Sequence, residues 1–157
     1  MKNIWISGSI NSGKSTVSKI LGKELKMAVI ELDAFSTFVQ TFLSFEEYLK
    51  LNYEIFSEIV EVYNKRNIGV VIVYPLSEQK YLEIQNTLNN FKIYTIDPSL
   101  EVSLMDRGER KLTNWERERI KYHYENNIHN VGFATRIDAK NKKPQETADE
   151  IMATFEQ

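Results

Sequence analysis

One short segment near the start of the chain combines the residue types that bind phosphate. It has glycines at 8 and 13, followed by Lys14 and the hydroxyl-bearing Ser15. This spacing, G-x-x-x-x-G-K-[ST], lets the backbone curl so that successive N–H groups and a helix start converge on phosphate oxygens. We expect Lys14 to reach the terminal phosphates of a nucleotide and Ser15 to ligate Mg²⁺. The predicted nucleotide-binding residues are Gly8, Ser9, Ile10, Asn11, Ser12, Gly13, Lys14, Ser15 and Thr16.

A carboxylate follows the second apolar run of the chain. Residues 28–32 are typical of a buried strand, and Asp33 comes directly after them. Phosphoryl transfer to an alcohol needs a group that accepts the proton of the attacking hydroxyl or orients that hydroxyl in line. Asp33 is the predicted base and, with Ser15, a predicted Mg²⁺ ligand; a helix cap is the alternative for this residue. Glu31 is expected to point to a different face.

The third apolar run ends without the aspartate that often helps to hold the metal in such sites. It reads Val-Tyr-Pro-Leu-Ser over residues 73–77. Mg²⁺ binding then depends on Ser15, Asp33, phosphate oxygens and water, which suits Mg²⁺ because it keeps much of its hydration shell. Ser77 is expected to cap the next helix rather than to bind metal.

Two arginines flank a glycine after the fourth apolar run. Arg107 and Arg110 are predicted to close as a lid over the nucleotide and to neutralise charge as the γ-phosphoryl group leaves. Cations at a helix end are the alternative, which explains Arg107 but not Arg110. The charged residues that follow, Arg117, Arg119 and Lys121, are expected on a solvated face. His123 and His129 are expected to be packing or surface residues.

The segment 137–144 is the candidate for the adenine contact. Backbone groups near Asn141 and Lys142 are predicted to read the base while lysine stems cover it. A plain solvent-exposed turn fits this segment nearly as well.

Strand-like and helix-like patterns alternate along the whole chain, which predicts a parallel sheet with helices on both faces. Strands are predicted at 3–7, 28–32, 69–74, 92–96 and 133–137, with helices beginning near 15, 45, 77, 100, 113 and 145. The expected fold is a three-layer α/β/α sandwich with strand order 2-3-1-4-5. In such sheets ligands bind at the carboxyl ends of the strands, where the candidate residues lie. We expect one domain over residues 1–157, with a lid near 107–115 and acceptor-binding helices near 35–65.

Composition excludes several classes of function. The chain has 157 residues and a formal net charge of −2, which offers no global attraction to nucleic acid or to an anionic membrane. It contains no cysteine and only two histidines, so thiolate catalysis and cysteine- or histidine-rich metal sites are absent. No signal peptide or membrane span is predicted, and the expected location is cytoplasmic. A homodimer is left open.

Taken together, these residues resemble the small phosphate-loop kinases that include adenylate, gluconate and shikimate kinases. The likeness is strongest to chloramphenicol phosphotransferase. It rests on the glycine-rich loop, Asp33, the Arg-Gly-acid-Arg segment, the Lys-Tyr-His run at 121–123, and Ile137-Asp138 with the Pro-Gln-Glu-Thr-Ala run at 144–148. The resemblance implies ATP-dependent phosphorylation of a small-molecule hydroxyl, with Asp33 as base and Arg107 and Arg110 in the lid. Residues 35–65 carry no such likeness.

The stretch that should line the acceptor pocket is poor in cations. Between Met27 and Asn64 the only cation is Lys50. Kinases that hold an anionic acceptor usually need arginine to do so. The stretch instead has aromatic residues and glutamates: Phe35, Phe38, Phe42, Phe45, Tyr48, Tyr53, Phe56, Glu46, Glu47, Glu54, Glu58 and Glu61. A neutral or cationic acceptor fits this lining better than an anion, although aromatics at helical spacing commonly face the core.

The sequence therefore predicts a kinase that uses ATP and Mg²⁺ to phosphorylate a hydroxyl of a small organic molecule, such as an antibiotic or a nucleoside. A nucleoside or nucleoside-monophosphate kinase is the first alternative. A regulatory ATP-binding protein without an acceptor is the second. A kinase of nucleic-acid 5′ ends is disfavoured by the acidic balance and by the lack of a basic stripe.

Overall fold

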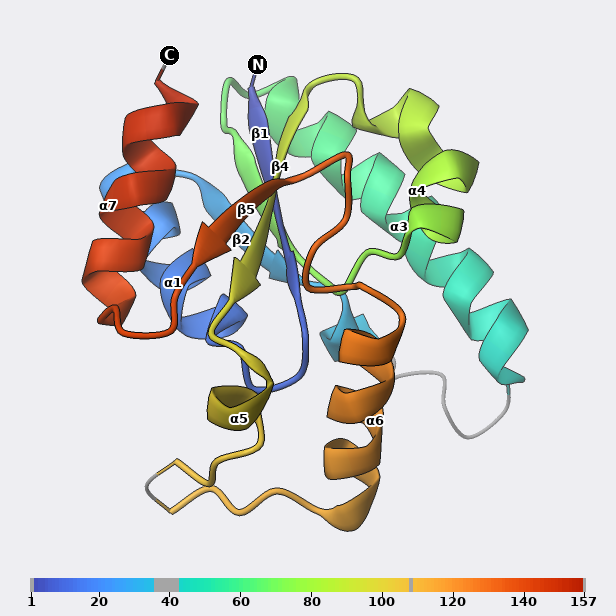
Figure 1. The fold of residues 1–157 in the computed structure, drawn as a ribbon. Helices are drawn as coiled ribbons and strands as arrows, with labels where there is room; N and C mark the ends of the chain where they lie inside the picture. Colours follow the sequence, from blue (N-terminus) through green and yellow to red (C-terminus); the bar gives the residue numbers. More distant parts are fainter. Residues whose placement is uncertain (1, 36–42, 108, 157) are drawn as a thin grey trace.

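In the computed structural model, five parallel strands form one sheet in the order β2-β3-β1-β4-β5, which confirms the predicted topology (Figure 1). The structure describes residues 2–35, 43–107 and 109–156, without the side chains of Phe45 and Leu49. The strands are β1 (Asn3–Gly8), β2 (Ala28–Glu31), β3 (Val70–Val73), β4 (Phe91–Asp97) and β5 (Thr135–Asp138).

Helices cover both faces of this sheet and its carboxyl edge. One face carries α1 (Lys14–Glu24) and α7 (Pro144–Phe155), and the other carries α3 (Phe45–Asn64) and α4 (Glu78–Ile84), followed by the 3₁₀ turn η1 (Gln85–Leu88). Beyond the carboxyl ends of the strands lie α5 (Leu100–Ser103) and α6 (Asn114–Glu125) (Figure 1). The predicted three-layer sandwich is confirmed.

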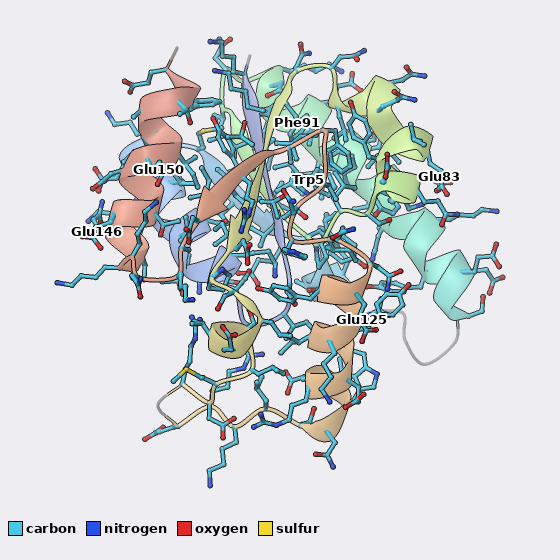
Figure 2. The ribbon with its side chains drawn as sticks, viewed as in Figure 1. Trp5, Glu83, Phe91, Glu125, Glu146 and Glu150 are labelled. Carbon is cyan, nitrogen blue, oxygen red and sulfur yellow. The ribbon has the colours of Figure 1, made fainter. Side chains whose placement is uncertain are left out.

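The alternation of side chains along β1 divides the core into two halves. Ile4 and Ile6 point to the α1 and α7 face, where they pack with Leu21 and Ile151. Trp5 points the other way, and its ring contacts Phe56 of α3 edge-on at 5.4 Å. Figure 2 shows Trp5 and Phe91 in the interior, with Glu146 and Glu150 on the outer side of α7. Both faces of the sheet are thus buried, which holds its carboxyl edge rigidly under the site.

Two predicted boundaries differ from the structure. The last strand was expected from 133 but begins at Thr135, because the Phe133 ring stacks on Tyr81 at 4.0 Å instead of joining the sheet. The helix expected from 100 to about 106 ends at Ser103. Its terminal carbonyls are taken by side chains from elsewhere, since Asn11 donates to the Ser103 and Met105 oxygens and Arg117 to that of Leu104.

Some predictions fall on parts of the chain that are not described. Phe38, Phe42 and the glycine of the Arg-Gly-acid-Arg segment, Gly108, lie outside the described residues, as does the side chain of Phe45. Ser77 does cap α4 as predicted, accepting from the Lys80 amide at 3.2 Å. Within the described part of the chain, no helix combines the length and apolarity that crossing a bilayer requires.

Candidate active site

The glycine-rich loop joins β1 to α1 with three residues at positive φ. These are Gly8 at 138°, Asn11 at 60° and Gly13 at 94°. A Cβ at Gly8 would lie 2.6 Å from the Ile96 carbonyl oxygen, so only glycine fits this approach to β4. Gly13 is the N-cap of α1 and makes no side-chain cap bond, which leaves the first amides of the helix available to an anion. The loop therefore has the backbone shape that its spacing predicted.

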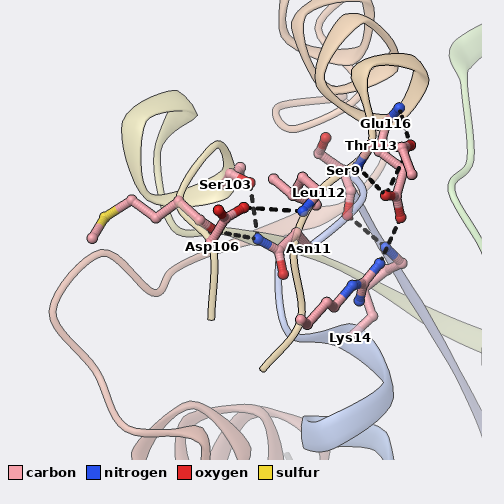
Figure 3. A network of polar contacts seen from close by, with 10 residues as sticks. Ser9, Asn11, Lys14, Ser103, Asp106, Leu112, Thr113 and Glu116 are labelled. Atoms are coloured by element: carbon pink, nitrogen blue, oxygen red, sulfur yellow. Dashed lines mark hydrogen bonds and ion pairs between the residues drawn. The ribbon is translucent and has the colours of Figure 1, made fainter. Parts of the chain in front are cut away.

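Lys14 lies at the centre of the charged groups of the site. Its Nζ donates to the Ser9 carbonyl oxygen at 2.6 Å, folded back over the loop (Figure 3). Burial lowers its pKa to about 8; Asp33 and Glu31 oppose this shift, and Arg110 adds to it. Lys14 thus lies within electrostatic reach of two other predicted catalytic residues, Asp33 and Arg110.

Asp33 follows β2 on the same sheet edge as the loop. Partial desolvation raises its pKa, Lys14 opposes that rise, and Glu31 adds to it. The pKa of Tyr74 is raised mainly by burial, and Asp33 adds to this rise. Strands β2 and β3 are neighbours in register from Ala28↔Val70 to Glu31↔Val73, so Asp33 and Tyr74 leave the sheet side by side. Glu31 was expected to point elsewhere, yet its charge acts on both Lys14 and Asp33.

The two lid arginines occupy different positions. Arg107 and Arg110 exchange backbone hydrogen bonds of 3.1 Å, which forms a tight turn. The Arg107 Nη1 lies 3.9 Å from the point where a Cβ on Gly13 would stand, so it faces the loop. The Arg110 guanidinium pairs with Glu116 of α6 at 2.9 Å. Arg107 is already beside the phosphate-binding loop, whereas Arg110 is held by α6.

Side-chain contacts attach the lid segment to its surroundings (Figure 3). Asn11 in the loop donates to the Ser103 and Met105 carbonyls at 3.0 and 2.9 Å. Asp106 accepts from the Leu112 amide at 3.0 Å and from Arg117 at 2.8 Å. Arg117, expected on a solvated face, therefore ties α6 to the base of the lid.

A cavity of about 280 Å³ opens beside the loop, between the lid and the β5–α7 connection. Lys142 lines it, and its ammonium also pairs with Glu150; its contact with adenine stays a prediction. Asn141 is exposed and does not line the cavity. Of the predicted loop residues, Ser12 and Gly13 contribute to the cavity wall; Ile10 and Ser15 are half-buried and Thr16 is exposed. The full set of lining residues is Ser12, Gly13, Val17, Ile96, Pro98, Val102, Met105, Asp106, Arg107, Ala139, Lys140, Lys142, Pro144 and Thr147.

The donor set suits Mg²⁺ only in company with phosphate. The described residues contain no group of three or more acidic or histidine side chains placed to hold a metal ion. Ser15 and Asp33 offer hard oxygen ligands near Lys14, which fits a metal that takes its other ligands from phosphate and water. Their role as Mg²⁺ ligands stays a prediction.

His123 contacts the loop, although the sequence marked it as a packing or surface residue. Its Nδ1 and the Ser9 hydroxyl share a hydrogen bond of 3.3 Å, and both side chains are buried. Burial, with Arg119 and Lys14 nearby, lowers its pKa to about 4, so the imidazole is neutral at physiological pH. The charges of Arg119 also reach Tyr74. The contact joins residues that are 114 positions apart, so no local sequence pattern predicts it.

No family model matches the chain. A shikimate kinase of Sulfurihydrogenibium sp. (strain YO3AOP1) is 29% identical over 169 aligned positions, covering 97% of this chain and 96% of that kinase. Among solved structures, a gluconokinase from Sinorhizobium meliloti 1021 superposes with a TM-score of 0.74 at 14% identity, over 99% of this chain and 91% of that one. The shikimate kinase from Aquifex aeolicus vf5 has a TM-score of 0.65 at 22% identity, over 98% and 96%.

A tunicamycin resistance protein from Deinococcus radiodurans shares the fold with a TM-score of 0.70 at 17% identity, over 98% of this chain and 95% of that one. These similarities agree with the geometry of the loop, Lys14 and the lid. The chain thus shares its fold with these solved structures and is similar in sequence to a shikimate kinase over nearly the full length of both chains.

Proposed function

We propose that this kinase transfers the γ-phosphate of ATP to a hydroxyl of a small, uncharged organic molecule, as in chloramphenicol phosphotransferases. The proposal is supported most directly by Asp33, which lies within electrostatic reach of both Lys14 in the phosphate-binding loop and Tyr74 at the end of β3. A carboxylate between the phosphate-binding lysine and the acceptor pocket is where a base for the attacking hydroxyl must stand.

The transfer needs positioning and charge neutralisation more than covalent chemistry by the protein. Lys14 leaves the Ser9 carbonyl for the β- and γ-phosphate oxygens, and Arg107 lies ready beside the loop. Ser15 and Asp33 would hold Mg²⁺ together with phosphate oxygens, and the ion would supply charge neutralisation on the phosphates. Asp33 accepts the hydroxyl proton as the acceptor oxygen bonds to the γ-phosphorus, and the bond to the bridging β-γ oxygen breaks to leave ADP. Arg110 completes the neutralisation when it leaves Glu116.

The uncharged acceptor follows from the residues of α3. Its single cation is Lys50, which is exposed. Burial raises the pKa of Tyr53, and Tyr74 and the buried Tyr48 add to this rise, so the three tyrosines lie near one another. Tyrosines near Asp33 favour a neutral molecule with ring or apolar character.

A carboxylate acceptor is the second candidate, and two observations favour it. One is the similarity to a shikimate kinase over nearly the full length of both chains. The other is Arg119, which lies near enough to Tyr74 to lower the pKa of that residue against the effect of burial. Arg119 lies on α6, outside the cation-poor stretch from Met27 to Asn64, and could supply the cation that a carboxylate acceptor needs.

One assay separates these candidates. ADP release and ³¹P NMR of the products would be followed with ATP, Mg²⁺ and a panel of hydroxyl compounds: chloramphenicol, myo-inositol, cytidine, thymidine, shikimate, gluconate, AMP, CMP and UMP. Transfer to a neutral compound supports the first candidate. Transfer to shikimate that is lost in Arg119→Ala supports the second. Rapid turnover of a monophosphate would make the protein a nucleotide kinase, and ATP hydrolysis indifferent to every compound would contradict both candidates.

A further inference from the structure

A buried amide without a hydrogen-bond partner lies in the middle of α3. The side chain of Asn52 is 2% exposed, and neither Nδ2 nor Oδ1 has a partner within the described structure. Burying an unpaired amide is unfavourable, and an apolar side chain of the same shape would pack there without that penalty. Buried amides normally have hydrogen-bond partners, so a bound molecule is the expected partner where the described residues provide none.

Helix geometry places this amide between the core and the tyrosines of the acceptor side. Tyr48, Asn52 and Phe56 follow one another at four-residue spacing, so they stack on one face of α3. Phe56 touches Trp5 at 5.4 Å and Phe91 at 6.0 Å, which directs this face toward the sheet. Figure 2 shows Trp5 and Phe91 on this inner side.

The next turn of the same face leads toward the candidate base. Tyr48 is 7% exposed and lies close enough to Tyr74 to act on its titration. Tyr74, in turn, leaves the sheet beside Asp33. Asn52 therefore lies one helical turn from Tyr48, which acts on the tyrosine that leaves the sheet beside Asp33.

The chemistry of the amide restricts its partner. Nδ2 donates and Oδ1 accepts, so the complement must present both an acceptor and a donor on neighbouring atoms. A vicinal pair of hydroxyls does so. A carboxylate satisfies only Nδ2 and brings its charge against Oδ1.

We propose that Asn52 is a specificity-determining residue that hydrogen-bonds a neutral vicinal diol of the acceptor, so that this kinase phosphorylates an uncharged polyhydroxylated compound. The inference rests on the proposed function and narrows its acceptor class. A cyclitol, a sugar or the ribose of a nucleoside each carries such a diol.

Matched pairs of acceptors test this inference, since each pair differs in charge but keeps its hydroxyls. The pairs are methyl shikimate with shikimate and gluconamide with gluconate, and myo-inositol and cytidine distinguish a ring polyol from a ribose. The wild type is expected to use the neutral member of each pair with the lower KM. Asn52→Leu and the smaller Asn52→Ala should each raise that KM by about tenfold or more while the KM for ATP stays within about twofold.

Asn64→Leu is the matched control, because Asn64 ends the same helix and its Oδ1 is likewise buried without a partner. It lies about three turns away and should leave every KM unchanged. Asn52→Leu should also melt no lower than the wild type, since the amide it removes has no hydrogen-bond partner among the described residues.

Two outcomes overturn the inference alone and leave the kinase intact. One is a wild-type preference for shikimate or gluconate over the neutral partner. The other is an unchanged KM in both Asn52 variants, with or without a lower Tm. An absence of transfer to any hydroxyl compound, with ATP still bound, would instead overturn the proposed function and the inference with it.

Discussion

The imidazole Nδ1 of His123 lies 3.3 Å from the hydroxyl of Ser9, so α6 directly contacts the phosphate-binding loop. The carbonyl oxygen of Ser9 also accepts a hydrogen bond from the Lys14 ammonium. The same short residue thus connects the loop's lysine to the helix that follows the lid. Arg119 lies one turn before His123 on this helix, and its charge acts on both His123 and Tyr74.

Replacing His123 with phenylalanine should weaken nucleotide binding without unfolding the protein. The change leaves the buried Ser9 hydroxyl unpaired and loosens the loop. One net hydrogen bond corresponds to a loss of affinity between about twofold and tenfold for a nonhydrolysable ATP analogue, measured by calorimetry. His129→Phe is the control, because His129 stacks on Tyr124 at 4.3 Å and has no contact with the loop among those described. Equal affinities in the two variants would remove His123 from this positioning role.

The same residue predicts a pH dependence of stability. Burial, then Arg119 and Lys14, lowers the pKa of His123 from its usual 6.5 to about 4. Between these values the unfolded chain binds a proton that the folded protein does not, so the free energy of unfolding falls as the pH drops through this window. At about 1.4 kcal/mol per pKa unit, the wild type should lose about 2 kcal/mol more than His123→Phe between pH 7 and pH 4.5.

Urea unfolding of both proteins at the two pH values measures this difference. Phenylalanine does not titrate, so the variant lacks the His123 contribution, while carboxylate titration is common to both proteins. Parallel stability curves would show that His123 takes up its proton in the folded state as readily as in the unfolded chain.

Local sequence signals were sufficient for the loop and for the order of the elements. The spacing of Gly8, Gly13 and Lys14 encodes positive φ values and a helix start within a few residues, and the structure shows both. The alternation of apolar runs with helical patterns likewise led to the parallel sheet, because right-handed crossovers leave few topologies to choose from. These features depend on neighbours in the chain.

Contacts between distant segments could not be predicted in the same way. Ser9 and His123 are 114 positions apart, and Asn11 reaches carbonyls more than 90 positions away. Glu31 was expected on another face from strand alternation; it is the last residue of β2, and its charge acts on Lys14 and Asp33. Arg117 and Arg119 both read as solvated on a charged helix. Arg119 is indeed exposed and lies over the Tyr122 ring at 4.7 Å, whereas Arg117 pairs with Asp106 at the base of the lid segment.

ATP binding at pH 8 should be accompanied by proton uptake at Lys14. Burial lowers its pKa to about 8, so about half of the free protein holds a neutral lysine at that pH. Phosphate oxygens favour the charged form and raise the pKa again. Calorimetry in buffers of different ionisation enthalpy should therefore give different apparent enthalpies, corresponding to uptake of up to about half a proton per nucleotide. Lys14→Arg should abolish the buffer dependence, and a buffer-independent wild type would contradict the prediction.

Asp33→Ala should lower kcat by about 10²- to 10⁴-fold, the usual contribution of a positioned base, while the affinity for an ATP analogue stays within about twofold. The measurement uses whichever panel compound the wild type phosphorylates. Glu31→Gln is the comparison, because it removes a charge near Lys14 without removing the proposed base. A larger loss of kcat in Glu31→Gln than in Asp33→Ala would reassign the base to Glu31.

Asn11→Gly should loosen the lid from the phosphate-binding loop. Glycine keeps the positive φ of this position but loses both hydrogen bonds to the Ser103 and Met105 carbonyls. At about 1 kcal/mol each, the lid segment should be cut by trypsin between about fivefold and thirtyfold faster, since cleavage follows the population of the open state. Arg107, Arg110 and Lys111 are the exposed cleavage positions in this segment.

Asn127→Gly is the matched control for the lid experiment, because Asn127 also has a positive φ, 54°, but lies at the far end of α6. Its cleavage rate should equal that of the wild type. A nonhydrolysable ATP analogue should slow cleavage of the wild type more than that of Asn11→Gly. The variant lacks the two Asn11 hydrogen bonds that attach the lid segment to the loop, so nucleotide binding should order its lid segment less. Identical cleavage rates in Asn11→Gly and the wild type would contradict the prediction. The Asn11 hydrogen bonds would then not hold the lid segment, and the Arg117–Asp106 pair would be sufficient.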